Sequence, residues 1–94
     1  MSVLASSISY TVQVWQEGGH YIAHAMPIDI MSCGATREEA YRMVDEAVAV
    51  LLRRLSETGA LQAVLEEAGY TLQNGEWVSP TWIGMEVHAT AAGF

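Results

Sequence analysis

The chain has 94 residues, with 11 acidic residues against four arginines and no lysine, and its formal net charge is −7 at pH 7. Its length predicts one domain with a small core, and 51% hydrophobic residues with 16% charged residues are typical of a globular chain. Because binding to phosphates needs positive charge, this composition makes the chain alone a poor candidate for nucleic-acid binding. An acidic surface suits a basic protein partner, but a solvated surface that keeps a small protein soluble is the more common reason for such a charge.

The cysteine content and the N-terminal segment predict the cellular location. Cys33 is the only cysteine, so the chain forms no intramolecular disulfide, and we expect a buried structural thiol. Residues 1–16 carry no charged side chain and lack the basic region of a signal peptide. No apolar run is long enough to span a bilayer. These features predict a soluble, cytoplasmic protein without a membrane association.

The first part of the chain has the pattern of three strands. Apolar and polar side chains alternate over residues 8–16, which predicts a half-buried strand. Residues 17–19 (Glu-Gly-Gly) form a turn signal, and residues 20–26 resume as the second strand of a hairpin. Pro27 ends that strand because it has no N–H to donate. The short apolar run 28–32 is interpreted as a third strand.

The next segment is typical of one long amphipathic helix over residues 36–59. Thr36 is the predicted N-cap, and Glu39 stands at the spacing of a capping box, in which it would bind the N–H of Thr36. Gly59 is the predicted left-handed residue at the C-terminus. An apolar stripe recurs at steps of three and four residues: Ala40, Val44, Ala47, Val48, Leu51, Leu52 and Leu55.

The last third of the chain predicts three further elements. Residues 60–68 have the pattern of a short helix whose apolar face includes Leu61, Val64 and Leu65. The Asn74-Gly75 dipeptide favours a type I′ turn in a hairpin over residues 70–79. After the break at Pro80, we expect residues 82–89 to form one more strand.

These elements predict an α+β fold in a single domain. A β-β-β-α core over residues 8–59 forms an antiparallel sheet packed on one long helix. A short second helix and a C-terminal hairpin form an extension over residues 60–94. We see no repeat, no linker and no second domain within residues 1–94.

Metal and cofactor sites are not supported by the sequence. His20 and His24 lie on one face of the same predicted strand, but their Cα atoms would be roughly 13 Å apart, too far to bind one ion. Cys33 and His88 have no partner at ligand spacing. The Gly18-Gly19 pair is a turn and not a phosphate-binding loop. We therefore expect no metal and no cofactor.

Catalytic residues are also not supported. Cys33 precedes the predicted helix N-terminus, where a thiol pKa can be lowered, but no base can be assigned to it. The carboxylates nearest the predicted core are Asp29, Asp45 and Glu46, and the last two are adjacent on the helix and should face water. We expect no catalytic residue, and the protein is not predicted to be an enzyme.

The order of these elements resembles the HicB antitoxin family. The resemblance covers residues 10–59: an aromatic-rich hairpin (YTVQVWQ and HYIAHAMP), a short apolar strand, and a Gly-x-Thr-x-x-Glu-Ala helix start. Its most specific positions are Gly34, Thr36, Glu39 and Ala40, supported by Tyr21, Ala23 and Pro27.

The resemblance implies a truncated RNase H-like core that lacks the nuclease residues of that fold. It also implies a non-catalytic antitoxin that binds and occludes a small basic ribonuclease toxin, HicA. Separately, the small core and the three tryptophans and four tyrosines of the chain favour a homo-oligomer, a dimer or a tetramer. Many HicB proteins add a C-terminal DNA-binding domain. Residues 60–94 contain no lysine or arginine, so DNA binding is not expected of this chain alone.

Two sets of residues are the expected partner contacts, and a second function remains open. The first set is Gln13 and Trp15 on the exposed face of a strand. The second is Glu38, Asp45 and Glu46 on the acidic side of the helix. The alternative is a solitary HicB-like oligomeric interaction module without a toxin. It is favoured by apolar residues near the C-terminus that suit self-association: Trp77, Trp82, Ile83, Met85 and Val87. A third possibility, a nuclease or other enzyme, would need activity that depends on Asp29 or Asp45.

Overall fold

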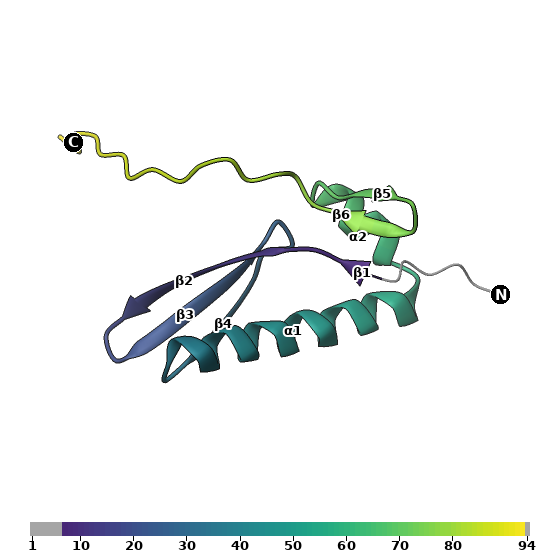
Figure 1. Cartoon of the computed structure of the whole chain (residues 1–94), viewed down its shortest axis with the longest axis horizontal. Helices are drawn as coiled ribbons and strands as arrows, with labels where there is room; N and C mark the ends of the chain where they lie inside the picture. The colour runs from purple at the N-terminus through teal and green to yellow at the C-terminus, as the bar shows by residue number, and fades with distance from the viewer. Residues whose placement is uncertain (1–6, 94) are drawn as a thin grey trace.

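A three-stranded antiparallel sheet and one long helix form the centre of the fold, as predicted. The computed structural model describes residues 7–93. Strands β2 (Thr11–Glu17), β3 (His20–Met26) and β4 (Ile30–Gly34) pair in the order β2-β3-β4. Helix α1 (Arg37–Thr58) lies along one face of this sheet (Figure 1).

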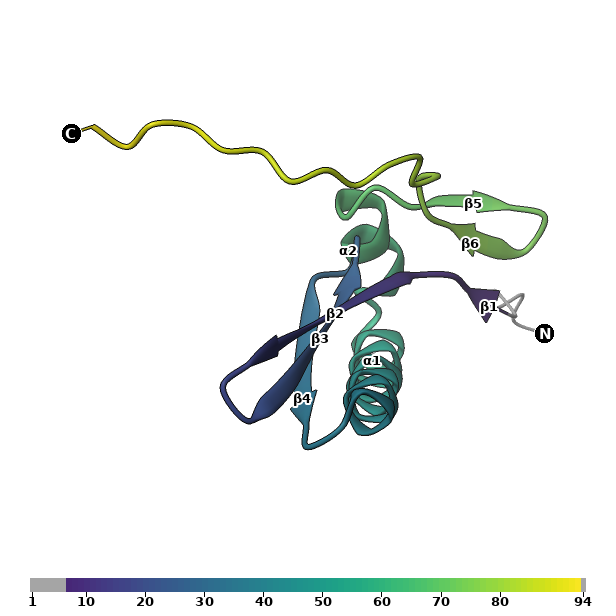
Figure 2. The same ribbon diagram turned by 60° about the vertical axis from the view of Figure 1, so that its left-hand side comes forward.

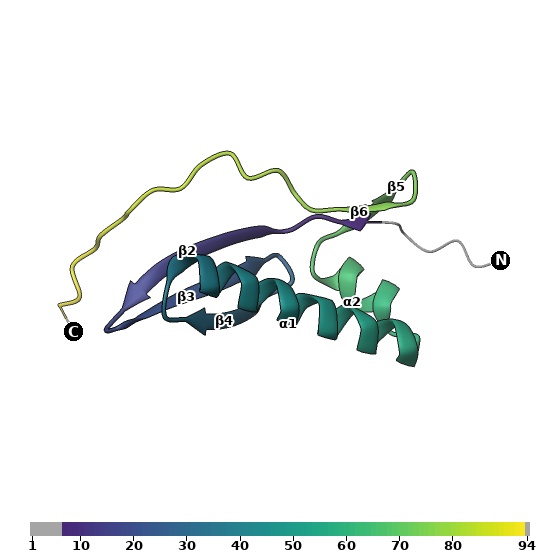
Figure 3. The same cartoon turned by 60° about the horizontal axis from the view of Figure 1, so that its bottom comes forward.

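A second, smaller sheet lies at the C-terminal end of α1. Helix α2 (Leu61–Glu67) leads into the hairpin of β5 (Thr71–Gln73) and β6 (Glu76–Val78). Strand β1 (Ser7–Ile8) adds to this hairpin in parallel with β6, so the order is β1-β6-β5 (Figure 2). Figure 3 shows the hairpin of β5 and β6 from another side. At the turn, Asn74 and Gly75 have φ angles of 52° and 80°, as expected for the predicted type I′ turn.

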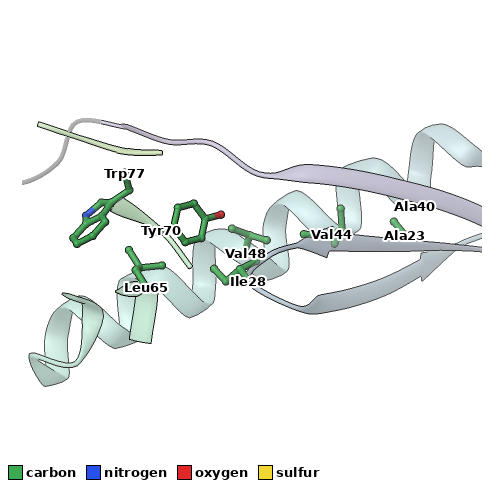
Figure 4. Packing of buried hydrophobic residues seen from close by; sticks show 9 residues of the cluster. Ala23, Ile28, Ala40, Val44, Val48, Leu65, Tyr70 and Trp77 are labelled. Carbon is green, nitrogen blue, oxygen red and sulfur yellow. The ribbon is translucent and has the colours of Figure 1, made fainter. Parts of the chain in front are cut away.

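The register of the β2–β3 hairpin decides which side chains enter the core. The two-residue turn Gly18-Gly19 joins Glu17 to His20, and the pairing continues from there to Thr11 opposite Met26. This register places small and β-branched side chains against the apolar stripe of α1. The buried core runs from this interface to α2 and the second sheet (Figure 4), and its members are Ala23, Ala25, Ile28, Ala40, Val44, Val48, Leu65, Tyr70 and Trp77.

Both ends of α1 are capped at the predicted residues, with one difference. The Thr36 hydroxyl accepts a hydrogen bond from the Glu39 N–H at 3.0 Å, and Gly59 has a φ of 77°. The Glu39 carboxylate, however, accepts from the N–H of Ala35 at 2.8 Å, one residue before the expected partner. The close approach of β4 to the first turn of α1 brings this amide within reach. Among residues 7–93, no helix is both long enough and apolar enough to cross a membrane.

Two predicted strands have different boundaries in the structure. The strand expected over residues 8–16 is divided into β1 and β2, because β1 turns away to pair with β6 and the N–H of Ser9 donates to the Trp77 carbonyl at 3.3 Å. The third strand begins at Ile30 instead of residue 28. The reason is a turn after Pro27, in which Asp29 has a φ of 65° and its N–H donates to the Ala25 carbonyl at 2.8 Å.

Three further expectations were wrong. Residues 82–89 do not form a strand, and Pro80, just before them, cannot donate a ladder hydrogen bond. Cys33 is exposed and not buried, because it lies on the face of β4 that α1 does not cover. The second helix is shorter than predicted by one residue at each end, and Val64 is 36% exposed although its spacing had placed it on the apolar face.

Candidate functional site

The candidate site is the face of the β2-β3-β4 sheet that points away from α1. Successive side chains of a strand point to opposite faces, and the alternate set packs under α1. Figure 2 shows α1 on one side of this sheet and no helix on the other, for the part of the chain that is described. The outer face, as we call it, consists of Thr11, Gln13, Trp15 and Glu17 of β2, His20, Ile22, His24 and Met26 of β3, and Met31 and Cys33 of β4.

His24 lies at the centre of the outer face and contacts three of its neighbours. Its Nδ1 atom is 3.4 Å from the amide nitrogen of Gln13 on the paired strand. Its ring meets the Trp15 ring edge-to-face, with centroids 6.4 Å apart. Its Nε2 atom is 2.6 Å from the Asp29 carboxylate, an ion pair when the imidazole is protonated. The two residues predicted on this strand face, Gln13 and Trp15, are therefore brought together by His24.

The pairing of His24 with Asp29 was not predicted from the sequence. Asp29 lies five residues after His24, across the Pro27 turn, and its left-handed backbone turns the carboxylate back toward the end of β3. Aspartate is one of the few residues that tolerate this conformation. The sequence contains one indication of this contact, since an aspartate just after a proline turn can reach a residue of the preceding strand. Because Asp29 was assigned to a strand over residues 28–32, the turn that brings it to His24 was not predicted.

The outer face combines an exposed thiol with aromatic, apolar and polar side chains. Cys33 lies on β4 opposite Ile22 and is exposed. Both ring nitrogens of His24 already face partners, Gln13 and Asp29, so the imidazole is not oriented to activate a thiol. Within residues 7–93, no group of three histidine, cysteine, aspartate or glutamate side chains could hold a metal ion. The arrangement instead offers an aromatic ring, apolar side chains and a few polar groups to a partner.

The predicted acidic contacts on α1 are exposed, but each has a neighbour that offsets its charge or donates a hydrogen bond to it. Glu38 lies 3.8 Å from Arg37, and Glu46 lies 3.4 Å from Arg42. Asp45 accepts a hydrogen bond from the Tyr10 hydroxyl at 2.6 Å. All four arginines of the chain are on α1. Exposed acids remote in sequence from any arginine lie elsewhere and include Glu17 of β2, Glu66 and Glu67 of α2, Glu76 of β6, and Glu86.

The structure therefore does not combine the two predicted sets into one surface. Gln13 and Trp15 are on the outer face of the sheet, whereas Glu38, Asp45 and Glu46 are on the helix that covers the opposite face. A partner that contacts both sets has to reach around the edge of the sheet. The outer face is the more continuous of the two, because its members belong to three paired strands.

The hydrogen bond from Tyr10 to Asp45 predicts a loss of stability at alkaline pH. Burial, followed by the bond to Asp45, raises the pKa of Tyr10 from 10.0 to about 12. Since the folded pKa exceeds the unfolded one, this contribution is complete below pH 10 and is lost as the pH rises toward 12. We expect Tyr10→Phe to reduce the fall in the free energy of unfolding over that range, measured by urea titrations at several pH values.

Tyr70 provides the comparison for this experiment. Burial also raises its pKa, and its hydroxyl donates to the Ser9 carbonyl at 2.7 Å, so Tyr10→Phe should leave part of the alkaline loss in place. In the protein with both Tyr10→Phe and Tyr70→Phe, most of the alkaline fall in the free energy of unfolding should be absent. An alkaline slope in Tyr10→Phe equal to that of the unchanged protein would contradict the assignment.

No protein family, curated protein or solved structure matches this chain.

Proposed function

We propose that the protein is a non-catalytic, HicB-like antitoxin that binds a small basic ribonuclease toxin of the HicA type and occludes its RNA-binding surface. The observation that carries this proposal is the outer face, an uncovered sheet surface with Trp15 and His24 at its middle. The β-β-β-α order over residues 10–59 that resembles HicB proteins supports it.

Trp15 is the expected anchor of the interface. Tryptophan residues account for much of the binding energy of many protein interfaces, since they bury a large apolar area and lose little conformational entropy. The Trp15 side chain is 36% exposed, its indole N–H donates to Glu17 at 2.7 Å, and its ring meets that of His24. Its orientation is therefore set before a partner arrives, which lowers the cost of binding.

The net charge is suited to the approach of a basic partner. A ribonuclease has to bind phosphates and carries a basic surface, while this chain has a formal charge of −7. Attraction between the two raises the association rate at low ionic strength more than it raises the final affinity. The exposed acids of α1, α2 and β6 would provide this attraction, and Trp15 would provide the contact that holds the complex.

The test starts with the tagged protein, used to purify partners from its native cells at low salt. We expect a small basic protein that cleaves RNA and whose cleavage the purified protein inhibits. Trp15→Ala should weaken that inhibition on the order of 10-fold or more, the effect of losing an anchor residue. Val50→Ala is the matched control, because Val50 is 44% exposed on α1, away from the outer face, and its loss should leave the inhibition unchanged.

Two results would contradict the proposal that the protein inhibits a ribonuclease toxin. One is recovery of the protein alone at low salt, and the other is a basic partner whose RNA cleavage is not inhibited. Equal effects of Trp15→Ala and Val50→Ala would instead reject the outer face as the binding surface.

A second candidate function is a HicB-like oligomeric interaction module without a toxin. It is favoured by the apolar side chains of the C-terminal segment, of which Ile83 is 95% exposed and Val87 fully exposed. Light scattering after size-exclusion chromatography distinguishes the two functions when combined with the purification. A stable dimer or tetramer that recovers no basic ribonuclease supports the module.

A further inference from the structure

Strand β2 has an open edge that carries none of the usual protective features. It pairs only with β3, so one side of its seven-residue backbone has no neighbour among the described strands. Natural edge strands are commonly shortened, bulged or marked by lysine or proline, which prevents unwanted pairing. Residues 11–16 contain no charged residue, no proline and no glycine. Such an edge is suited to receive another strand.

The segment that follows β6 has the pattern of a strand and no strand to pair with. Ile83, Met85 and Val87 alternate with Gly84, Glu86 and His88, the spacing of one apolar and one polar face. All three apolar side chains are at least 79% exposed. Among the described residues, none of the backbone hydrogen bonds outside the regular elements involves residues 79–93. The exposed apolar side chains leave the segment available to pair with another strand.

The segment and the open edge lie side by side, separated by a groove. The groove has a volume of about 460 Å³ and is lined by β2 from Thr11 to Trp15, by Met26 of β3, by Tyr41 of α1, and by Trp82, Gly84 and Met85. In Figure 1 the C-terminal segment leaves β6 in the same direction as β2 runs. A segment that could pair with the open edge of β2 therefore lies next to it in the same chain.

From these observations we propose that residues 82–87 close onto β2 of the same chain as a fourth strand, parallel to β2. The pairing of β1 with β6 fixes the expected register, with Ser7 opposite Glu76 and Ile8 opposite Trp77. Continued along both segments, it places Trp82 beside Gln13 and Ile83 beside Val14. This inference is independent of the proposed function.

In this register, the non-aromatic apolar side chains of residues 82–87 would lie on the same side of the sheet as the valines of β2. Paired residues of neighbouring strands share a face, so Ile83 and Met85 would lie on the side of Val14, toward α1, where Tyr41 is 41% exposed. Trp82 would join Gln13 and Trp15 on the outer face. The apolar side chains of Ile83 and Met85 thus enter the core side, while Glu86 would lie beside Glu17 on the outer face and point to solvent. A shift by one residue would reverse every one of these placements.

The short connection favours closure within one chain over exchange between two copies. Only three residues separate the end of β6 at Val78 from Trp82, and β6 already runs parallel to β1. This connection holds the segment near its own β2 at a high effective concentration. Pro80 lies in the connection and interrupts the ladder between the β1–β6 pair and the new pair.

A disulfide experiment on the full chain tests the closure and its register. In a Cys33→Ser background, Gln13→Cys combined with Trp82→Cys places two thiols on neighbouring strands, within the range that a disulfide spans. We expect an intramolecular disulfide to form in mild oxidant, at a rate independent of protein concentration. The control pairs Gln13→Cys with Ile83→Cys, whose side chains would point to opposite faces, and it should remain reduced.

Hydrogen exchange provides a second measurement on the chain without added cysteines. Closure should slow the exchange of the outward-pointing amides of β2, and Ile83→Asp with Met85→Asp should raise their exchange rates on the order of 10-fold, with the β3–β4 amides unchanged. Disulfide-linked dimers would overturn closure within one chain in favour of exchange between copies. Equal oxidation of both cysteine pairs, or β2 amides that exchange alike in both proteins, would overturn the proposal altogether.

Discussion

Gly34→Ala is expected to destabilise the protein by about 3 kcal/mol, near the upper end of what an extra group in a packed site costs. Gly34 ends β4, and a Cβ atom at this position would lie 2.7 Å from the amide nitrogen of Ala40 and 2.9 Å from the carbonyl carbon of Glu39. Both are backbone atoms in the first turn of α1. They cannot move away without disturbing the Thr36 cap and the bond from the Ala40 N–H to the Thr36 carbonyl.

Gly19→Ala is the matched control, because a Cβ atom there would meet no atom within 4 Å. Urea unfolding followed by circular dichroism should show a large loss for Gly34→Ala and a change within about 0.5 kcal/mol for Gly19→Ala, the usual range for surface substitutions. Similar midpoints for Gly34→Ala and the unchanged protein would contradict the close approach of β4 to α1.

Leu65→Ala is expected to cost about 3 kcal/mol, the middle of the range for removing a buried leucine side chain. Leu65 is fully buried, and it joins α2 to Tyr70 and Trp77 in the part of the core beside the second sheet (Figure 4). A small domain has only about 5–15 kcal/mol of stability in total. Because the expected loss is a large part of this total, we expect a marked fall in the urea midpoint.

The neighbouring Val64 tests whether burial, and not helix propensity, causes this loss. Val64 is 36% exposed on the same helix, and Val64→Ala should change the free energy of unfolding by less than about 1 kcal/mol. An equal loss in the free energy of unfolding for Leu65→Ala and Val64→Ala would contradict the packing of α2 against the second sheet.

The α+β architecture could be predicted from local patterns because its main elements have strong signals. The capping residues Thr36 and Gly59 and the apolar stripe between them defined α1, and the structure places its ends at Arg37 and Thr58. The turns at Gly18-Gly19 and Asn74-Gly75 defined two hairpins. In each case the signal lies within a few residues of the feature, so no knowledge of distant contacts was needed.

Boundaries that depend on distant partners were not predicted. The alternating pattern of residues 8–16 reads as one strand, but Ser7 and Ile8 belong to a sheet whose other strands lie nearly seventy residues later. The exposure of Cys33 and the contact of His24 with Asp29 also depend on which face α1 covers and on the turn after Pro27. Local composition contains no information on these pairings.

The candidate site shows the same division. Gln13 and Trp15 could be assigned to an exposed strand face from alternation alone, and both lie on the outer face. The acids of α1 could be identified as exposed, but not as neighbours of arginines and of Tyr10. His24 was considered only as a metal ligand, and its contacts with Gln13, Trp15 and Asp29 became visible once the register was known.

The sequence by itself determined the helix, the two hairpins and the alternation of apolar side chains, because caps, turn residues and periodicity act over a few neighbouring residues. Only the tertiary structure decided that β1 leaves the first sheet for β6, that one face of the β2-β3-β4 sheet stays uncovered, and that the C-terminal segment lies beside an open edge. These features follow from contacts between segments far apart in the chain, where burial and strand pairing prevail over local preference.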